Sequence, residues 1–307
     1  MTDRRKFLQS AGTLVGGSLL FPDMLSAHFR QKTHPVGVQL FTFFETIDKD
    51  VKGTLEKIAA TGYREIESAF SKLGGYYGMK PKEFATYVAS LGMSWQSHHV
   101  LGAPFELPKG SKMPMGSDGK PIELPPIKNL RDNMQEIIDD MSEAGVPYLV
   151  CASTPIDTLD AVKRSIEVLN KSAEACHKAG IQLCYHNHYK EFEPIDGTAP
   201  YDLLLNETNS QHLKFELDLA WAVKAGQNPV DLFKAHPGRF PLWHVKDLNK
   251  DKETVEPVGR GIVDYKTIFA HAKTGGMKHF FVEHDMPSNP MESIRTSYTY
   301  ITKTLGI

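Results

Sequence analysis

The chain has 307 residues, 41% of them hydrophobic and 23% charged, which is enough for a substantial core in one large domain or two small ones. Its formal net charge of −2 at pH 7 argues against nucleic acid or an anionic membrane surface as a partner. Beyond the N-terminal region, no segment is apolar for long enough to cross a bilayer.

The N-terminal 30 residues have the pattern of an export signal. Arg4 and Arg5 precede a Phe-Leu pair, and a short apolar stretch follows before small residues at Ser26 and Ala27. This order is typical of a signal peptide, and the paired arginines resemble a twin-arginine signal. The alternative is a basic, amphipathic first helix. We expect residues 1–30 to be the signal, with an approximate end, and the protein to be periplasmic or otherwise exported, without stable membrane insertion.

The three cysteines do not suggest a disulfide framework. Cys151, Cys176 and Cys184 show no CxxC spacing, and their number is odd. We expect buried thiols that pack as small apolar side chains.

Eight short β-rich runs are spaced along the remaining chain. The first is "VGVQLFTF" at 36–43, and another is "LKFELDL" at 213–219, which is entered through a polar turn. The other six each follow a glycine that ends an amphipathic helix: Gly62, Gly92, Gly145, Gly180, Gly238 and Gly276. Glycine just past a helix adopts the left-handed conformation that turns the chain back into a strand.

Helical patterns lie between these runs, at 50–60, 81–91, 129–144, 158–179, 200–208, 229–236 and near 290–304. Strands that alternate with helices indicate a parallel sheet with helical crossovers. Eight such units predict an α/β fold, a single-domain (β/α)8 TIM barrel over residues 31–307. An open doubly wound sheet is the runner-up, and it is weaker because no Gly-rich phosphate fingerprint follows the first run.

A long segment interrupts the repeat after the third predicted strand. Residues 102–128 are rich in Pro, Gly and Lys and have no periodicity. A loop of this length in a barrel is often functional, and at this position it would lie on the active face as a lid. A disordered surface insertion is the equal alternative.

Polar residues stand where the predicted strands end, which is where barrel enzymes carry their chemistry. In chain order they are Glu65 and Glu67, His98 and His99, His186 and His188, Glu216 and Asp218, His244 and Lys246, and Glu283 and Asp285. Mixed carboxylate and imidazole ligands suit Mn, Zn, Co or Fe(II). Such an ion could polarise a carbonyl and stabilise an enediolate.

Five motifs carry a resemblance to a known family: "YHNHYKEFE", "FELDLAWAVKAGQNP", "LWHVKD", "VGRGIVDY" and "FFVEHD". Together and in this order they resemble the sugar phosphate isomerase/epimerase family of xylose isomerase-like TIM barrels, over roughly residues 35–305. The resemblance implies an enzyme with one divalent metal, held by residues of strands 5 to 8 that are usually Glu, Asp, His and Glu.

Transferred by motif, the metal ligands are His186, Asp218, His244 and Glu283. The first of these is a glutamate in the epimerases, and His188, which shares its strand face, is the alternative ligand. The histidine that does not bind metal would orient the substrate or carry a proton.

The substitution at His186 bears on the mechanism that the resemblance implies. Epimerases place two metal-bound glutamates on opposite faces of the substrate, and here only Glu283 remains as a catalytic base. A metal-bound neutral imidazole cannot act as the second base, so Glu216, His188 or Lys246 would have to supply it. Lys246 could have a lowered pKa near the metal, or it could form a structural pair with Asp247.

The candidate substrate-binding residues are Glu67, His99, Glu216, Trp221 and Arg260. His99 best matches the histidine that the family has after strand 3, although "SHH" leaves the register with His98 open. Glu67 could bind sugar hydroxyls or pair with Arg64 at the surface. Trp221 could form an apolar wall against a sugar ring, and "VGRGIVDY" could bring Arg260 over the site.

The predicted function is metal-dependent isomerisation or epimerisation of an unphosphorylated sugar or keto-sugar by proton abstraction next to a carbonyl. Phosphorylated cytosolic sugars would rarely meet an exported enzyme. With one flanking glutamate replaced, a lyase or hydratase (dehydratase) acting on a 3-keto sugar or glycoside is the runner-up. Relatives that dehydrate inosose carry a similar His-x-His at strand 5.

Two further classes are weaker. A non-catalytic, exported sugar-binding barrel would not need the set of Asp218, His244 and Glu283. A metal-dependent nuclease on this barrel would need more ligands and a basic face, which the near-neutral charge does not support. The sequence leaves a homo-oligomer open.

Overall fold

The computed structural model describes residues 34–106 and 125–307. The predicted signal at 1–30 and most of the predicted lid at 102–128 lie outside the described residues. No helix in the described ranges is both long and apolar enough to span a membrane.

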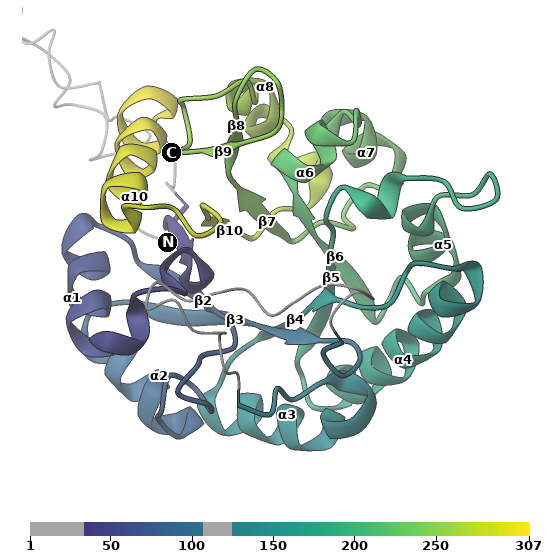
Figure 1. Cartoon of the computed structure of the whole chain (residues 1–307), viewed down its shortest axis with the longest axis horizontal. Helices are drawn as coiled ribbons and strands as arrows, with labels where there is room; N and C mark the ends of the chain where they lie inside the picture. The colour runs from purple at the N-terminus through teal and green to yellow at the C-terminus, as the bar shows by residue number, and fades with distance from the viewer. Residues whose placement is uncertain (1–33, 107–124) are drawn as a thin grey trace, which may run out of the picture. The chain divides into compact units, whose positions relative to one another are not determined.

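Eight parallel strands close into a barrel, in the order β1-β10-β7-β6-β5-β4-β3-β2, with helices on its outside (Figure 1). The strands are β1 Gly37–Gln39, β2 Glu65–Ser68, β3 Ser94–Leu101, β4 Tyr148–Ser153, β5 Gln182–His186, β6 Leu213–Asp218, β7 Leu242–Val245 and β10 His279–Val282. The predicted (β/α)8 barrel is confirmed, and the doubly wound alternative is wrong because β1 and β10 pair and leave no open edge.

Helices connect successive strands. They are α1 Val51–Thr61, α2 Pro81–Ser90, α3 Leu130–Ala144, α4 Leu159–Lys178, α5 Pro200–Glu207, α6 Leu219–Lys224, α7 Pro229–Ala235, α8 Tyr265–Ala270, α9 Ala272–Gly275 and α10 Pro290–Thr299, which continues as a π-helical segment at Tyr300–Leu305. The seven predicted helices are present. Helices α8 and α9 occupy the helical segment that is predicted to end at Gly276. The sequence did not reveal α6, since six residues are too short to show a helical period.

Helix α4 illustrates why these segments are helical. The side chain of Thr158 accepts a hydrogen bond from the backbone N–H of Ala161 and caps the first turn. Val162, Ile166 and Leu169 then recur at spacings of four and three and are buried against the barrel. The amphipathic period therefore sets which face of the helix covers the sheet.

Gly276, at the end of α9, has the left-handed conformation that the sequence pattern predicts, and it also lies too close to a neighbouring loop for a side chain. It has a φ of 84°, in the left-handed region. A Cβ atom there would lie 2.7 Å from the Cα of Gly238, so the two loops approach each other too closely for a side chain.

The first predicted strand, 36–43, is too long. Strand β1 ends at Gln39, whose side chain accepts a hydrogen bond from the backbone N–H of Phe41 at 3.0 Å. That bond begins a 3-10 turn at Leu40–Phe43. Two further 3-10 turns lie at Ile47–Lys49 and Lys190–Phe192, and a short antiparallel hairpin of β8 Asp247–Leu248 and β9 Val255–Glu256 follows β7.

A small apolar cluster inside the barrel consists of Val150, Cys184, Leu242 and Phe281. Cys184 and Leu242 stand two residues before His186 and His244, so this cluster lies one layer below those histidines. All three cysteines are buried free thiols, as predicted. The polar site thus rests on an apolar floor at the carboxyl ends of the strands.

Candidate functional site

The inner layer of the site is a buried carboxylate among three imidazoles. The Oε2 atom of Glu216 lies 2.7 Å from His99 Nε2, 2.9 Å from His186 Nδ1 and 3.2 Å from His244 Nε2. The four residues come from β3, β5, β6 and β7, and each is at most 8% exposed. Barrel closure therefore brings together residues that are more than a hundred positions apart.

Glu67 supports two of these imidazoles. Its Oε1 atom lies 2.5 Å from His244 Nε2 and 3.0 Å from His99 Nε2, and it accepts a hydrogen bond from Gln39 Nε2 at 2.8 Å. The Ser97 hydroxyl donates to its other oxygen. Glu67 thus fixes the orientation of both rings.

Both sequence-based interpretations of Glu67 are therefore wrong. The residue is fully buried, and its hydrogen bonds leave it no free surface for sugar hydroxyls. Arg64 does not pair with it, since its guanidinium donates to the backbone carbonyls of Ala59 and Tyr63. Glu67 acts through the histidines, as a positioning residue.

The outer layer is a lysine among three carboxylates. The Nζ atom of Lys246 lies 2.6 Å from Glu283 Oε2, 3.0 Å from Asp218 Oδ2 and 3.1 Å from Asp285 Oδ2. Glu283 Oε2 also lies 2.8 Å from His244 Nδ1 and so connects the two layers. Asp285, which stood among the strand-end residues without a predicted role, belongs to this group.

The predicted pair of Lys246 and Asp247 is wrong, because the two side chains serve different sites. The Asp247 carboxylate accepts hydrogen bonds from the backbone N–H groups of Gly259, Gly261 and Val263 at 2.9 to 3.0 Å. Asp247 therefore anchors the glycine-rich "VGRGIVDY" segment, while Lys246 belongs to the site.

Without a metal ion the pKa of Lys246 is raised, whereas the predicted lowering concerns the metal-bound site. Burial would lower the pKa of the ammonium, but Asp218, Asp285 and Glu283 together raise it well above its ordinary value. Lys246 is thus held protonated and can donate hydrogen bonds, but it is a poor base.

The register of "SHH" is settled in favour of His99. His98 faces the outside of the barrel, where its Nδ1 lies 2.7 Å from Ser68 Oγ. Its ring packs against Tyr76 and Trp95, with centroids 5.0 and 6.0 Å apart. Only His99 reaches the inner layer.

His188 lies at the rim of the site. Its side chain is 45% exposed, and its ring centroid is 4.9 Å from that of His186. Between them, Asn187 accepts a hydrogen bond from the backbone N–H of Asp218 at 3.1 Å and ties β5 to β6. Asn187 had no role in the sequence-based prediction, although its place between two candidate ligands could have suggested one.

Of the two candidate substrate-binding residues Trp221 and Arg260, only Trp221 lies beside the site. The Trp221 backbone N–H donates to Asp218 Oδ1 at 2.8 Å, and its ring centroid is 5.2 Å from Lys246 Nζ. Trp221 therefore borders the outer layer. Arg260 is exposed and lines a surface hollow with Tyr300, so it does not contribute to the cluster.

Two groups of side chains could hold a metal ion. Ligand atoms of Asp218, His244 and Glu283 all lie within 4.8 Å of one another, and so do those of His99, His186, Glu216 and His244. Glu216 Oε1 is buried and accepts no hydrogen bond from the described residues, whereas Asp218 Oδ2 has Lys246 Nζ 3.0 Å away. A buried carboxylate oxygen without a donor is costly, and the mixed carboxylate and imidazole donor set fits a divalent cation. His186 belongs to the second group and also lies near the first, because its Nε2 is 4.0 Å from Asp218 Oδ2.

Burial and neighbouring charges shift the pKa values of Glu216 and Glu283 in opposite directions. Burial, with the charge of Glu67, raises the pKa of Glu216 to about 7. Burial would also raise the pKa of Glu283, but Lys246 and His244 outweigh it and lower the pKa below its ordinary range. Glu283 is therefore held ionised, while Glu216 can exchange a proton near neutral pH.

The pKa values of two imidazoles, His99 and His186, are also shifted in opposite directions. Burial would lower the pKa of His99, but the carboxylates of Glu67 and Glu216 raise it to about 9. Burial, together with His244, lowers the pKa of His186 well below its ordinary value. His186 is thus neutral and has a lone pair for a metal ion.

The raised pKa of His99 predicts a contribution to stability that the metal-free protein loses as the pH rises. The folded protein keeps the His99 proton up to about pH 9, whereas the unfolded chain releases it near pH 6.5. The contribution is complete below about pH 6.5 and is lost toward pH 9, and it is on the order of 3 kcal/mol. Urea unfolding after metal removal, at several pH values, measures this loss.

The exposed His34 supplies the control for this measurement. His99→Gln should reduce the pH dependence of the free energy of unfolding, and His34→Gln should leave it as it is. An unchanged slope in the His99→Gln protein would show that the His99 proton is not held by these carboxylates.

The sequence is similar to a family of known proteins. A family model described as xylose isomerase-like TIM barrel matches residues 55–304. A curated inosose dehydratase of Lacticaseibacillus casei is 23% identical over 174 residues, which are 50% of this chain and 58% of the dehydratase. The chain thus spans less than two thirds of this curated relative.

Solved structures show the same fold. A sugar phosphate isomerase/epimerase from Parabacteroides distasonis is 24% identical, with a TM-score of 0.67 over 92% of this chain and 98% of its own. The IolI protein with a bound zinc atom is 16% identical, with a TM-score of 0.66 over 89% and 98%. The matched model covers well over half of the sequence, and the barrel agrees with it. The chain therefore belongs to the xylose isomerase-like TIM barrel family.

Proposed function

We propose that the protein is a metal-dependent enzyme that isomerises or epimerises an unphosphorylated sugar or keto-sugar by removing a proton next to the carbonyl. The observation that carries this proposal is the outer layer. Three buried candidate ligands, Asp218, His244 and Glu283, meet where this layer joins the inner one, and their ligand atoms all lie within 4.8 Å of one another. A site that only bound sugar would have no need of such a set.

His186, Asp218, His244 and Glu283 would hold the ion, which we propose to be Mn, Zn, Co or Fe. When bound, it would polarise the substrate carbonyl and make the adjacent C–H more acidic. The zinc bound in the structurally similar IolI protein supports a divalent ion as the cofactor.

The chain's own residues would then move the proton. Glu283, held ionised by Lys246 and His244, is the base that takes it. The Lys246 ammonium keeps its own proton and donates a hydrogen bond to the oxygen on which negative charge develops. His188 at the rim would return a proton, and Trp221 would lie against the sugar ring.

A dehydratase or lyase acting on a 3-keto sugar or glycoside is the second candidate. Two observations favour it: His186 stands where a second glutamate would be needed for two-base epimerisation, and the curated relative is an inosose dehydratase. One carboxylate base and one acid that protonates the leaving group are sufficient for such an elimination.

Solvent deuterium separates these alternatives. The metal-loaded protein is incubated with keto-sugars in deuterium oxide and followed by proton NMR. Exchange into recovered sugar or its epimer supports the first candidate, and a dehydrated product supports the second. Binding without exchange or product would contradict both and leave the sugar-binding barrel.

We also propose, on the pattern at residues 4–27 alone, that this chemistry takes place in the periplasm or otherwise outside the cytoplasm.

The fourth ligand can be assigned by metal analysis of two variants. We expect about one ion per chain in the wild-type protein and loss of most of it in His186→Ala, because His186 is buried beside Asp218. The matched control His188→Ala should keep its metal, since that side chain is 45% exposed at the rim. Mass spectrometry of the metal content measures this, and the reverse result would make His188 the ligand.

A further inference from the structure

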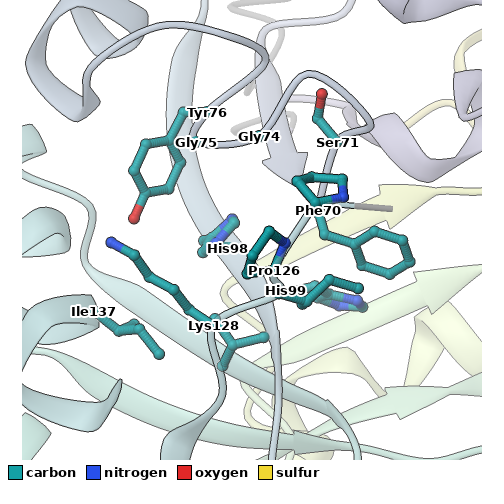
Figure 2. A pocket seen from close by; sticks show the side chains of 13 residues that line it. Phe70, Ser71, Gly74, Gly75, Tyr76, His98, His99, Pro126, Lys128 and Ile137 are labelled. Atoms are coloured by element: carbon teal, nitrogen blue, oxygen red, sulfur yellow. The ribbon is translucent and has the colours of Figure 1, made fainter. Parts of the chain in front are cut away.

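A cavity lined by both His98 and His99 adjoins the site at β3 (Figure 2). It lies between the segment after β2, strand β3 and the start of α3, and we call it the side chamber. Its lining includes Phe70, Tyr76, His98, His99, Lys128 and Ile137, together with Val100 and the run Pro125–Ile127. Because His99 also belongs to the inner layer, a molecule held at the site could extend into the side chamber.

Most of the chamber wall is apolar or aromatic. Phe70 belongs to a group of three phenyl rings, with centroids 5.9 Å from that of Phe41 and 5.5 Å from that of Phe44. Tyr76 and Ile137 are buried, and prolines form part of the wall. Such surfaces bind flat, apolar groups.

The charged and polar side chains in the wall are already engaged. Lys128 Nζ lies 2.7 Å from Asp140 Oδ2 and 2.8 Å from Glu136 Oε1, so its charge is compensated. The Ser71 hydroxyl donates to Asp48 at 2.7 Å. A phosphate or carboxylate would find no uncompensated cation among the described lining residues, and a second sugar would find few partners for its hydroxyls.

His98 is the exception, because a hydrogen-bond chain sets its tautomer. The Trp95 indole N–H is shared between Ser68 Oγ and the Ser97 carbonyl oxygen, each at 2.8 Å. Among the described residues, the acceptor left for the Ser68 hydroxyl is His98 Nδ1, at 2.7 Å. The ring then carries its proton on Nε2, for which the described residues offer no partner. A side chain only 7% exposed thus presents one N–H to the chamber.

We propose that the side chamber binds an uncharged aromatic group, carried by the substrate beside its reacting sugar, and that His98 Nε2–H donates a hydrogen bond to an oxygen of that group. The substrate class is then an aryl 3-keto glycoside, because a glycoside without the keto group has no carbonyl next to which a proton could be removed. The inference rests on the proposed function only in placing the sugar at the Asp218 and Glu283 layer.

Calorimetric titration of the full, metal-loaded chain with unreactive probes tests this. Phenyl and 4-acetylphenyl β-glucosides should bind at least about tenfold more tightly than methyl β-glucoside, since the ring would leave water for an apolar wall. Equal affinities for phenyl and methyl glucosides would overturn the proposal. Tighter binding of cellobiose than of the aryl glucosides would overturn the aromatic occupant.

Two variants locate the effect. Ile137→Phe fills the chamber and should remove the preference for aryl over methyl glucosides, whereas Ile262→Phe, the same change at a position 40% exposed, should preserve it. An aryl preference that survives Ile137→Phe would overturn the location. His98→Phe keeps a ring against Tyr76 but loses the N–H, so it should weaken 4-acetylphenyl binding about threefold or more relative to phenyl binding. Equal losses for the two probes would overturn the role of His98.

The two proposals fail separately in these experiments. Absence of deuterium exchange and of any dehydrated product would remove the proposed reaction but would not change an affinity ratio between probes. Absence of an aryl preference would remove the chamber's role but would leave exchange on simple keto-sugars in place.

Discussion

Glu283→Gln is expected to lower the rate of deuterium exchange into the sugar by about 10²- to 10⁴-fold, the usual contribution of a positioned base. The amide cannot take up a proton, and it is a weaker ligand than the carboxylate. It also loses the ion pairs that Glu283 Oε2 makes with Lys246 at 2.6 Å and His244 at 2.8 Å. Proton NMR of the sugar in deuterium oxide gives the rate directly.

The matched control is Glu292→Gln, the same change at an exposed position on α10, and it should exchange at the wild-type rate. Metal content is measured on both proteins, so that loss of the base is separated from loss of the ion. A Glu283→Gln protein that exchanges as fast as the wild type would exclude this carboxylate as the base.

Lys246→Met is expected to destabilise the metal-free protein by about 3 to 5 kcal/mol, the usual cost of leaving buried charges without a partner. The substitution removes the ammonium from Asp218, Glu283 and Asp285 and leaves His244 as the remaining partner of Glu283. A divalent ion should restore much of the loss, because it supplies positive charge to the same oxygens. Urea unfolding with and without added metal measures both effects.

Lys250→Met, at an exposed position in the following turn, is the control and should change the free energy of unfolding little. An equal loss in both variants would mean that the buried charges are not what Lys246 stabilises. If added metal stabilised Lys246→Met no more than the wild type, the ion would not share these carboxylates.

The barrel was predictable because its signals are local and repeated. Each predicted glycine, such as Gly145, ends a helix or turn with positive φ and precedes a buried strand. The metal-ligand candidates were predictable for a related reason, since residues such as Asp218 and His244 follow apolar runs and pair in register across neighbouring strands. Position in the strand was enough to bring them to one end of the barrel.

The partners within the site were not predictable, because they depend on strand register and side-chain direction. Gln39 and Ser97 both pair in register with Glu67, and that neighbourhood turned a presumed sugar ligand into a support for the imidazoles. Strand alternation would have shown that His98 and His99 face opposite ways, but only the structure shows which one faces inward. From the sequence alone, Lys246 could pair with Asp247 or with Glu283.

The glycine-rich segment around Gly259 and Gly261 has a consequence for the substrate. Its backbone N–H groups converge on one anion, as they do in loops that bind phosphate, but that anion is the carboxylate of Asp247. A Cβ atom on Gly261 would lie 2.3 Å from this carboxylate, so the glycine is needed for the chain to wrap it. The loop has the form of a phosphate-binding loop, but its N–H groups are already bound to a carboxylate of the protein. They are therefore not available to bind a phosphoryl group of a substrate.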